Sequence, residues 1–212
     1  MPITLDSVAH AVRTFLKVHP HDGERLTPLI SFLAEKPESC IDRKEFRGHV
    51  TVNAVLVNDA AEVLLIRHVA LDRWLTPGGH IEATDTSLLA AALRELAEET
   101  GVSADRTTAL SRSPVDIDIH GIPESVAKAE PAHQHFDFRF LFRTAGRGDL
   151  VPQLEEVSEV AWRSLQELPA DRLRERVAVA LSGSQARHVG DTSVTGAPVP
   201  PRAARAESGS GR

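Results

Sequence analysis

Three glutamates near the middle of the chain carry the clearest chemical signal in the sequence. Glu95, Glu98 and Glu99 are spaced three and four residues apart, so on a helix turning about 100° per residue they share one face. Like charges at this spacing repel one another by about 0.2–0.5 kcal/mol per pair. Carboxylate oxygens are the ligands that Mg²⁺ and Mn²⁺ prefer, and either cation would remove the repulsion. The spacing therefore favours a divalent-cation site, with a solvated acidic helix face as the alternative.

The segments on either side of these acids predict how they are held. Residues 86–100 are expected to form a helix whose apolar stripe faces the core, and Gly101 stands where a C-terminal cap belongs. Gly78 and Gly79 precede the helix by a short loop, and glycine lets the backbone approach a ligand closely. A strand, a glycine turn, a loop and an acidic helix would form the edge of a pocket suited to a pyrophosphate group.

Alternating and β-branched segments around this helix predict a sheet. Residues 49–57 and 62–67 are expected to pair as a hairpin through a turn at 58–61. A short strand is expected at 74–76, which Pro77, Gly78 and Gly79 are expected to halt. The other expected elements are strands at 113–120, 136–142 and 157–162 and a helix at 165–181. This order predicts an α/β sandwich with a mixed sheet.

The stretch from Arg94 to Val102, RELAEETGV, resembles the end of the Nudix box at every defined position of that motif. The family pattern runs Gly, five residues, Glu, seven residues, then Arg-Glu-apolar-any-Glu-Glu-any-Gly-apolar. The preceding PGGHIE, residues 77–82, also resembles the family's approach to the box. The resemblance covers about residues 48–165 and implies the α/β/α sandwich of Nudix proteins.

One position departs from the family pattern. Counted from Gly79, the first glutamate of the box falls on Asp85, and eight residues rather than seven separate Asp85 from Arg94. The loop is one residue longer and the acid one methylene shorter. In the family this first acid is mainly structural, so the departure puts that role in question for Asp85 and leaves the metal ligands of the second half unchanged.

The resemblance implies a Mg²⁺- or Mn²⁺-dependent pyrophosphohydrolase that cleaves a nucleoside diphosphate linked to another moiety, by attack of water at phosphorus. Glu95, Glu98 and Glu99 would bind the metal, with the Gly79 carbonyl as a further ligand. Arg94 would orient the glutamates by charge-assisted pairs. The expected catalytic residues are Glu95, Glu98 and Arg94, with Glu95 or Glu98 helping to take the proton of the water. Family members differ in where their base lies.

Four residues outside the box are expected to bind substrate. His133, His135 and Asp137 alternate as they enter a strand and so share one face. A metal or phosphate role for them is weighed against a plain polar strand face opposite the phenylalanines of 136–142. Arg67 stands before the glycine loop and is a candidate phosphate contact, with an ordinary surface position as the alternative.

A further acid outside the box often serves Nudix proteins as ligand or base. Glu155, Glu156 and Glu159 are the candidates here, just before an expected strand. For each of them a surface position is the favoured interpretation.

Composition bounds the class of protein. The 212 residues are 42% hydrophobic and 25% charged, with a net charge of -6, as in ordinary globular proteins. There is no cluster of Lys or Arg to bind nucleic acid, no apolar run of the roughly 20 residues that span a bilayer, and no signal-peptide pattern at the start. These features predict a cytoplasmic protein that acts on a small molecule, without nucleic-acid or membrane partners.

Three parts of the chain differ in composition and in the structure expected of them. Residues 1–47 are expected to form a helical extension, capped at Asp6 or Ser7, that packs on the rest of the chain or on a second subunit. Residues 48–181 are expected to form the Nudix-like domain. Residues 182–212 are poor in large apolar groups and are expected to be a flexible tail. A homodimer is in keeping with a family that often dimerises.

Two other functions fit the same fold. An isomerase of a prenyl diphosphate needs a catalytic cysteine, and the single cysteine, Cys40, precedes the first core strand. A non-catalytic nucleotide-ligand sensor usually lacks acids of the box, whereas all three glutamates are present here. The sequence leaves the substrate open among nucleoside triphosphates, nucleotide sugars, dinucleotides and specialised nucleotides.

Overall fold

The centre of the fold is a parallel pair of strands, β1 (His49–Val57) and β7 (His133–Thr144). A computed structural model describes them together with the rest of residues 2–37, 40–126, 129–153 and 156–190. The two strands stay in register from His49 opposite His135 to Val57 opposite Arg143. Both are buried almost throughout, because helices cover both faces of the sheet, as is usual for parallel strands.

Six further strands complete a mixed sheet in the order β3-β2-β1-β7-β5, with β4 on β1, β6 on β7 and β8 on β2. β2 (Glu62–His68) follows β1 in the predicted hairpin, with Val63 opposite Val57. The remaining strands are β3 (Arg73–Leu75), β4 (Gly78–His80), β5 (Thr107–Ala109), β6 (Asp116–Ile122) and β8 (Val157–Ser164). All pairs except β1 with β7 are antiparallel. The predicted mixed sheet is confirmed.

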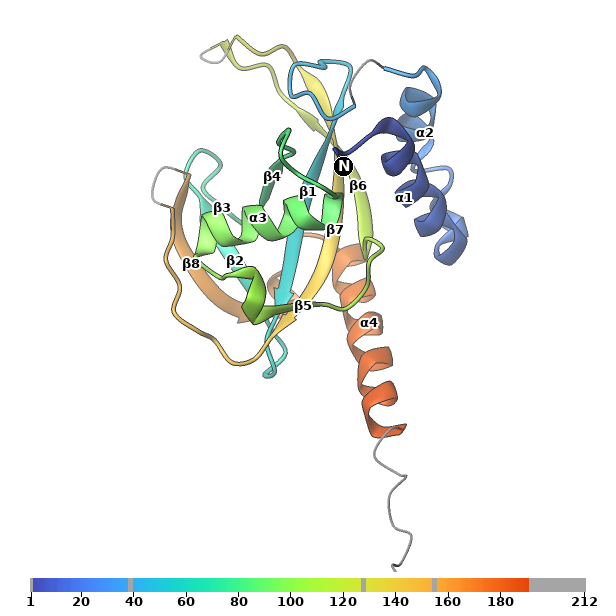
Figure 1. Ribbon diagram of the computed structural model, residues 1–212. Coiled ribbons are helices and arrows are strands. Elements are labelled where there is room, and N and C mark those ends of the chain that lie inside the picture. Colours follow the sequence, from blue (N-terminus) through green and yellow to red (C-terminus); the bar gives the residue numbers. More distant parts are fainter. Residues whose placement is uncertain (1, 38–39, 127–128, 154–155, 191–212) are drawn as a thin grey trace, which may run out of the picture.

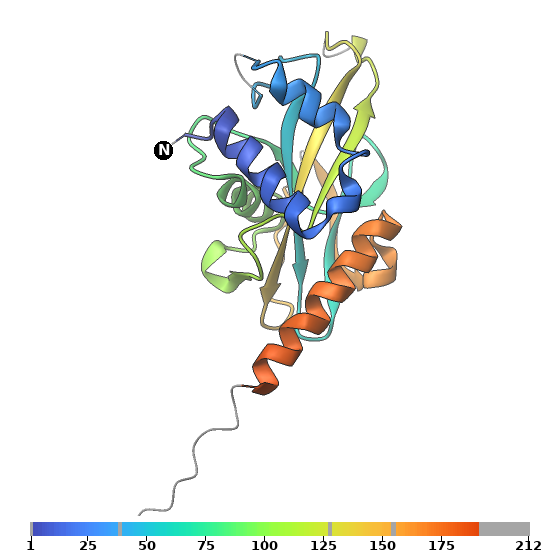
Figure 2. The ribbon, with the colours of Figure 1, turned by 90° about the vertical axis from the view of Figure 1, so that its right-hand side faces the viewer.

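Helices pack on both faces of the sheet and make the predicted sandwich. α1 (Leu5–Val18), α2 (Thr27–Ala34) and α3 (Leu88–Thr100) share an apolar core with Val52 and Phe138. α4 (Asp171–Gly190) packs on the opposite face, with Val55 and Leu141. Figure 1 shows α3 across the sheet, with α1 and α2 beside each other at its right. In Figure 2 α1 and α2 lie across the strands, and α4 runs diagonally below them.

Helix ends follow local capping chemistry. α1 is capped by Thr4 rather than by Asp6 or Ser7, because Thr4 Oγ1 accepts from Ser7 N–H at 3.2 Å while Ser7 Oγ accepts from Thr4 N–H at 2.9 Å. This reciprocal pair is a capping box, in which Ser7 is the third helical residue. At α3, Ser87 caps the start, and Gly101 ends the helix with a φ of 74° as predicted.

Several boundaries differ from the predicted ones. β3 ends before Pro77 as predicted, but residues 78–80 then form a further strand, β4, which pairs with β1 because Gly78 and Gly79 lack side chains that would collide with their neighbours. β6 begins at residue 116 instead of 113, β7 extends beyond 136–142 at both ends, and β5 was not predicted. Short 3-10 turns in the described part of the chain include η1 (Pro20–Asp22), η2 (Ala104–Arg106) and η4 (Leu165–Glu167).

The last helix is shifted relative to its predicted span. Pro169 lies between the 3-10 turn at Leu165–Glu167 and α4, since proline is disfavoured in a helix interior. α4 then continues to Gly190 rather than ending at residue 181, so residues 182–190 of the predicted tail are helical. Residues 191–212 of that tail lie outside the described residues. Among the described helices none is long and apolar enough to cross a membrane.

A network of buried ion pairs joins segments that are far apart in the sequence. Asp116 of β6 is fully buried and accepts from Arg139 at 3.3 Å, from Arg172 at 3.1 Å and from Arg176. Arg176 also reaches Asp22, between α1 and α2. In all, the network includes Asp22, Arg25, Asp116, Asp118, Asp137, Arg139, Arg172 and Arg176. Its four acids and four bases fasten the N-terminal helices and α4 to the sheet.

Replacing Asp116 with alanine should destabilise the protein by about 3–5 kcal/mol, because buried arginines lose their counter-charge. For a chain of this size the melting temperature should fall by about 6–20 °C in a thermal scan followed by circular dichroism. Asp72→Asn is the matched control, since the side chain of Asp72 is 78% exposed and its ion pair with Arg67 lies at the surface. Equal melting temperatures for the two variants would show that the network does not hold the fold together.

Candidate active site

The helix α3 carries the three glutamates along the side that faces β4. An adjoining stripe of the helix packs into the core through Ala92 and Leu96. The three carboxylates differ in exposure: Glu99 is 3% exposed, the side chain of Glu95 is 13% exposed and that of Glu98 is 48% exposed. The acids therefore extend from the protein interior to solvent along one edge of a rigid helix.

Gly79 of β4 allows α3 to come this close, and its neighbour Gly78 allows β4 to lie against β1. A Cβ atom at Gly79 would lie 2.7–2.8 Å from the carboxylate of Glu95, and one at Gly78 would lie 2.3 Å from the Val52 carbonyl oxygen. Both distances are too short for any side chain. The backbone N–H of Gly78 donates to Glu99 Oε2 at 2.8 Å, which fixes the buried carboxylate against the strand. The predicted close approach at the glycines is therefore to the glutamates themselves.

Arg94 holds the acidic side of the helix to the loop before it. Its guanidinium donates to both oxygens of Asp85 at 3.1 and 3.0 Å and to the His80 carbonyl at 2.8 Å. It also donates to Glu95 at 3.1 Å and to Glu98 at 2.8 Å. Charge-assisted bonds of this kind set the orientation of both partners. Arg94 is thus placed to orient two of the three glutamates.

Asp85 has a structural role in the loop before α3 although its position departs from the family pattern. Asp85 is buried, receives two bonds from Arg94 and accepts from the backbone N–H of Glu82 at 2.8 Å. A shorter acid on a loop longer by one residue therefore still reaches the arginine, and it makes the structural contact expected of the first acid of the box.

Burial raises the pKa of two of the glutamates. Desolvation raises the pKa of Glu95 to about 7, against the opposing effect of Arg94, and that of Glu99 to about 8, against the bond from Gly78. The charges of Glu98 and Glu156 raise both pKa values further. Three neighbouring carboxylates with one arginine among them form a set of hard oxygen donors with too little positive charge. Such a set fits Mg²⁺ or Mn²⁺.

A fourth acid, Glu156, lies near this group. The backbone N–H groups of Val151 and Gln153 donate to the carbonyls of Thr100 and Glu99, at 2.8 and 3.3 Å, and this places the segment leading to Glu156 against the end of α3. Glu156 is exposed, as the sequence predicts. The sequence does not predict that Glu156 lies near Glu95 and Glu99, because no pattern near the box indicates it. Glu159 is exposed on β8, and Glu155 lies outside the described residues.

His133 and His135 lie on the opposite face of β4 from the glutamates. Successive residues of a strand point to opposite faces, so that Gly79 faces Glu95 while the ring of His80 lies 5.3 Å from that of His135. The ring of His49 lies 5.0 Å from His133 and 4.7 Å from His135. Burial lowers the pKa of His49 and His135 and lowers that of His80 to about 4, so these rings are neutral near pH 7. The sequence did not single out His49 or His80.

The other two residues expected to bind substrate have protein partners. Asp137 is buried and accepts from Thr51 at 3.1 Å, Asn53 at 2.7 Å and Arg139 at 3.0 Å, so it belongs to the ion-pair network. Arg67 is bonded to the exposed Asp72 at 2.8 Å. Substrate binding by His133, His135, Asp137 and Arg67 stays a prediction.

Cys40 is not placed for nucleophilic chemistry. It is buried, and desolvation raises the pKa of its thiol to about 11, so the thiol stays protonated. The reactive form of cysteine is the thiolate.

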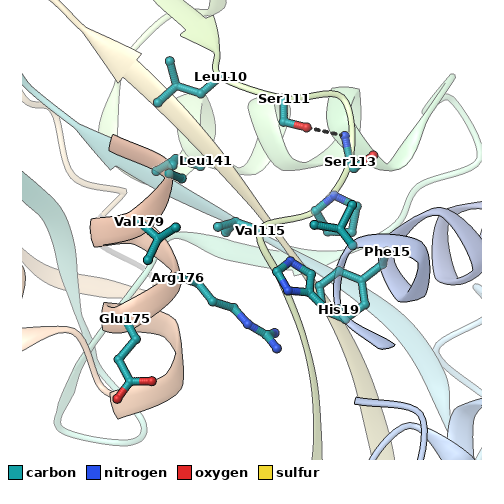
Figure 3. A pocket seen from close by; sticks show the side chains of 13 residues that line it. Phe15, His19, Leu110, Ser111, Ser113, Val115, Leu141, Glu175, Arg176 and Val179 are labelled. Carbon is teal, nitrogen blue, oxygen red and sulfur yellow. Dashed lines mark hydrogen bonds between the residues drawn. The ribbon is translucent and has the colours of Figure 1, made fainter. Parts of the chain in front are cut away.

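A cavity of about 580 Å³ lies apart from the glutamates, between the end of α1, α4 and the loop before β6. Figure 3 shows Phe15, Leu141 and Val179 around it, with the Arg176 side chain extending between the helices. None of its lining residues belongs to α3 or β4. The cavity is therefore not part of the acidic site.

Comparison with known proteins identifies the fold and the family. A family model described as the NUDIX domain matches residues 47–181. A protein of Lactococcus lactis subsp. cremoris named "Probable DHNTP pyrophosphohydrolase" is 32% identical over 134 residues, which make up 60% of this chain and 74% of that protein.

Two solved structures share the fold at lower identity. An Ap4A hydrolase of C. elegans aligns with a TM-score of 0.50 and 18% identity, covering 63% of this chain and 98% of that one. The E. coli dihydroneopterin triphosphate pyrophosphohydrolase aligns with a TM-score of 0.50 and 17% identity, covering 61% of this chain and 92% of that one.

The metal-free protein should become less stable as the pH rises from about 6.5 to 8. Folded Glu95 and Glu99 still hold protons there, with pKa values of about 7 and 8, whereas unfolded glutamates have released theirs near pH 4.5. A state that binds more protons loses stability as the pH rises. Below pH 6.5 the buried histidines act in the opposite direction, which is why the window starts there.

Mg²⁺ should raise the melting temperature more at pH 8 than at pH 6.5, because it competes with these protons for the same oxygens. Thermal scans with EDTA or with Mg²⁺ at both pH values test this, and Glu99→Gln should flatten the metal-free pH dependence. A melting temperature that is constant in EDTA across the window would contradict the assignment of the buried carboxylates.

Proposed function

From the premise that this chain belongs to the Nudix family and is a Nudix pyrophosphohydrolase, we propose that it cleaves a nucleoside diphosphate linked to another moiety, with Mg²⁺ or Mn²⁺ and by attack of water at phosphorus. The observation that carries the proposal is the packing of Glu95 and Glu99 against Gly79 and Gly78, with Glu98 beside them and a single arginine among the three. This arrangement leaves a local excess of negative charge where a cation and a phosphate group would meet.

The residues proposed to hold the cation are Glu95, Glu98 and Glu99, with the carbonyl of Gly79. When bound, the cation supplies polarisation of the phosphoryl oxygens and a lower pKa for the attacking water. The protein's own contribution is geometry: the N–H of Gly78 holds Glu99, and Arg94 holds Glu95 and Glu98 at 3.1 and 2.8 Å.

Glu98 is proposed to accept the proton of the attacking water. Of the two candidates for this role it is the one that meets solvent, since 48% of its side chain is exposed against 13% for Glu95. A general base must lie within hydrogen-bond reach of the proton that it removes. Arg94, bonded to Glu98, keeps the carboxylate directed along the helix face, and we assign it a positioning role.

The substrate class proposed is a small nucleotide-like molecule with a diphosphate linkage. The name of the Lactococcus lactis relative refers to DHNTP, which makes this compound one candidate beside nucleoside triphosphates, nucleotide sugars and dinucleotides. A nucleotide sensor on the same fold would bind one of these compounds without turnover, so the same panel separates the two functions.

Glu98→Gln should lower kcat by about 10²–10³-fold on the best substrate of a panel assayed with Mg²⁺ for released phosphate or nucleotide. Loss of a positioned general base typically has an effect of about this size. The exposure of Glu98 makes a folding defect a poor explanation for the loss, and Glu159→Gln, an exposed acid of β8, should keep full activity. Equal kcat for Glu98→Gln and the unchanged protein would refute the assigned role.

Glu156→Gln should lower activity by about 10-fold and raise the Mg²⁺ concentration needed for half-maximal rate. Its charge adds to the field at Glu95 and Glu99 without a bond to either, so the effect should be smaller than that of losing a ligand. Glu159→Gln again serves as the control, because it removes the same charge from a neighbouring exposed position. Identical Mg²⁺ dependence in the two variants would place Glu156 outside the site.

A further inference from the structure

A second group of potential metal ligands lies on the face of β4 opposite the glutamates. His49 is the first residue of β1, His133 is the first residue of β7, and His135 lies opposite His49 in the strand pairing. One ring nitrogen from each of the three lies within 4.8 Å of the others. The sheet therefore brings together three imidazoles from segments more than 80 residues apart in the sequence.

Backbone carbonyls orient two of the rings. Nδ1 of His133 lies 2.8 Å from the Pro131 carbonyl oxygen, and Nδ1 of His49 lies 3.4 Å from that of Glu45. A carbonyl accepts a hydrogen bond, so it favours the tautomer with the proton on Nδ1 and leaves Nε2 with a lone pair. Metal-binding histidines in proteins characteristically donate their other ring N–H to a carbonyl in this way.

Two ring nitrogens of the group are left without a hydrogen-bond partner in the described part of the chain. His49 is 1% exposed, and its Nε2 and that of His135 are buried without a hydrogen-bond partner among the described residues. Leaving a buried polar atom unpaired costs about 1–3 kcal/mol. Two such atoms beside each other, in a group of three neighbouring histidines, indicate a ligand that accepts nitrogen lone pairs.

We propose that His49, His133 and His135 bind one divalent transition-metal ion of the Zn²⁺ type, at a site separate from the glutamates. Neutral imidazole suits Zn²⁺, Co²⁺, Ni²⁺ and Cu²⁺, whereas Mg²⁺ selects oxygen donors. A tetrahedral ion held at about 2.0–2.1 Å by three histidines keeps a fourth position for water or another ligand.

The position of the site suggests what the ion does for the fold. It would join the first residue of β1 to the start of β7, at the end of the parallel pair on which the sheet is built. The Arg43–Glu130 ion pair, at 3.0 Å, connects the segments that precede the same two strands. A bound ion would reinforce this connection, so occupancy should raise the melting temperature as well as the metal content.

The test uses tag-free, EDTA-stripped full-length protein kept in excess Mg²⁺, so that the glutamates are supplied with their preferred ion. Titration with Zn²⁺ in a calorimeter, with metal content measured after dialysis, should give one Zn²⁺ per chain. His135→Gln and His133→Gln should each weaken this binding by at least about 100-fold, beyond the 10–100-fold lost when only the hydrogen-bond partner of a ligand is removed. Circular dichroism verifies that each variant is folded.

Three comparisons make the result decisive. His21→Gln, which removes an exposed histidine from the turn after α1, should bind Zn²⁺ as the unchanged protein does. Glu98→Gln should also keep the Zn²⁺, which separates this site from the acidic one. Co²⁺ in the unchanged protein should give the intense visible absorption of a four-coordinate ion, a readout that needs no variant. Absence of tight Zn²⁺ binding, or binding lost with Glu98→Gln and kept with His135→Gln, would overturn the proposal.

Discussion

The close approach of α3 to β4 is the constraint on which the site depends. It exists because Gly79 has no side chain, so that the carboxylate of Glu95 occupies the space where a Cβ atom would lie, and because the backbone N–H of Gly78 bonds the carboxylate of Glu99. Arg94 strengthens the contact by bonding the His80 carbonyl of the strand and the glutamates of the helix. The helix is thereby fixed in its rotation about its own axis, and that rotation decides which carboxylates are buried and which one meets solvent.

Charge balance separates the two groups of buried ionisable side chains. Around Asp116, four acids face four arginines, and each charge has a partner, as expected of a network that holds structural elements together. Around Glu95 and Glu99 the acids outnumber the one arginine, and desolvation raises both pKa values toward neutrality. Buried carboxylates without enough positive charge around them reduce the stability of the isolated protein. Such carboxylates are characteristic of functional sites, including sites that bind a cation.

β4 has a different chemical environment on each face although it is only three residues long. Gly79 faces hard carboxylate oxygens on α3, while His80 faces neutral imidazoles on β1 and β7. The alternation of a strand produces this separation directly. Oxygen donors and nitrogen donors therefore lie near each other but on opposite faces of the strand.

The sequence by itself determined the local features: the helix of residues 88–100 with its acidic face, the glycine at its end, the β1–β2 hairpin and the buried phenylalanine stripe of β7. Each depends on spacing within one segment, which periodicity reveals. The resemblance to the Nudix box also implied that Arg94 orients the glutamates, and its bond to Glu98, four positions away on the helix, agrees with that role. The cap at Thr4 and the end of α4 at Gly190 were misjudged, because boundaries depend on a few local bonds that composition does not show.

Only the tertiary structure decided which distant residues meet. The pairing of β1 with β7 brings His49 to His133 and His135, and the return of the chain past the end of α3 brings Glu156 near the glutamates. Asp137 lies on the same strand face as His133 and His135, as alternation predicts. It bonds Arg139, however, and so belongs to the ion-pair network and not to the histidine group. Register between strands and the path of loops follow from packing of the whole core, and no spacing within a single segment encodes them.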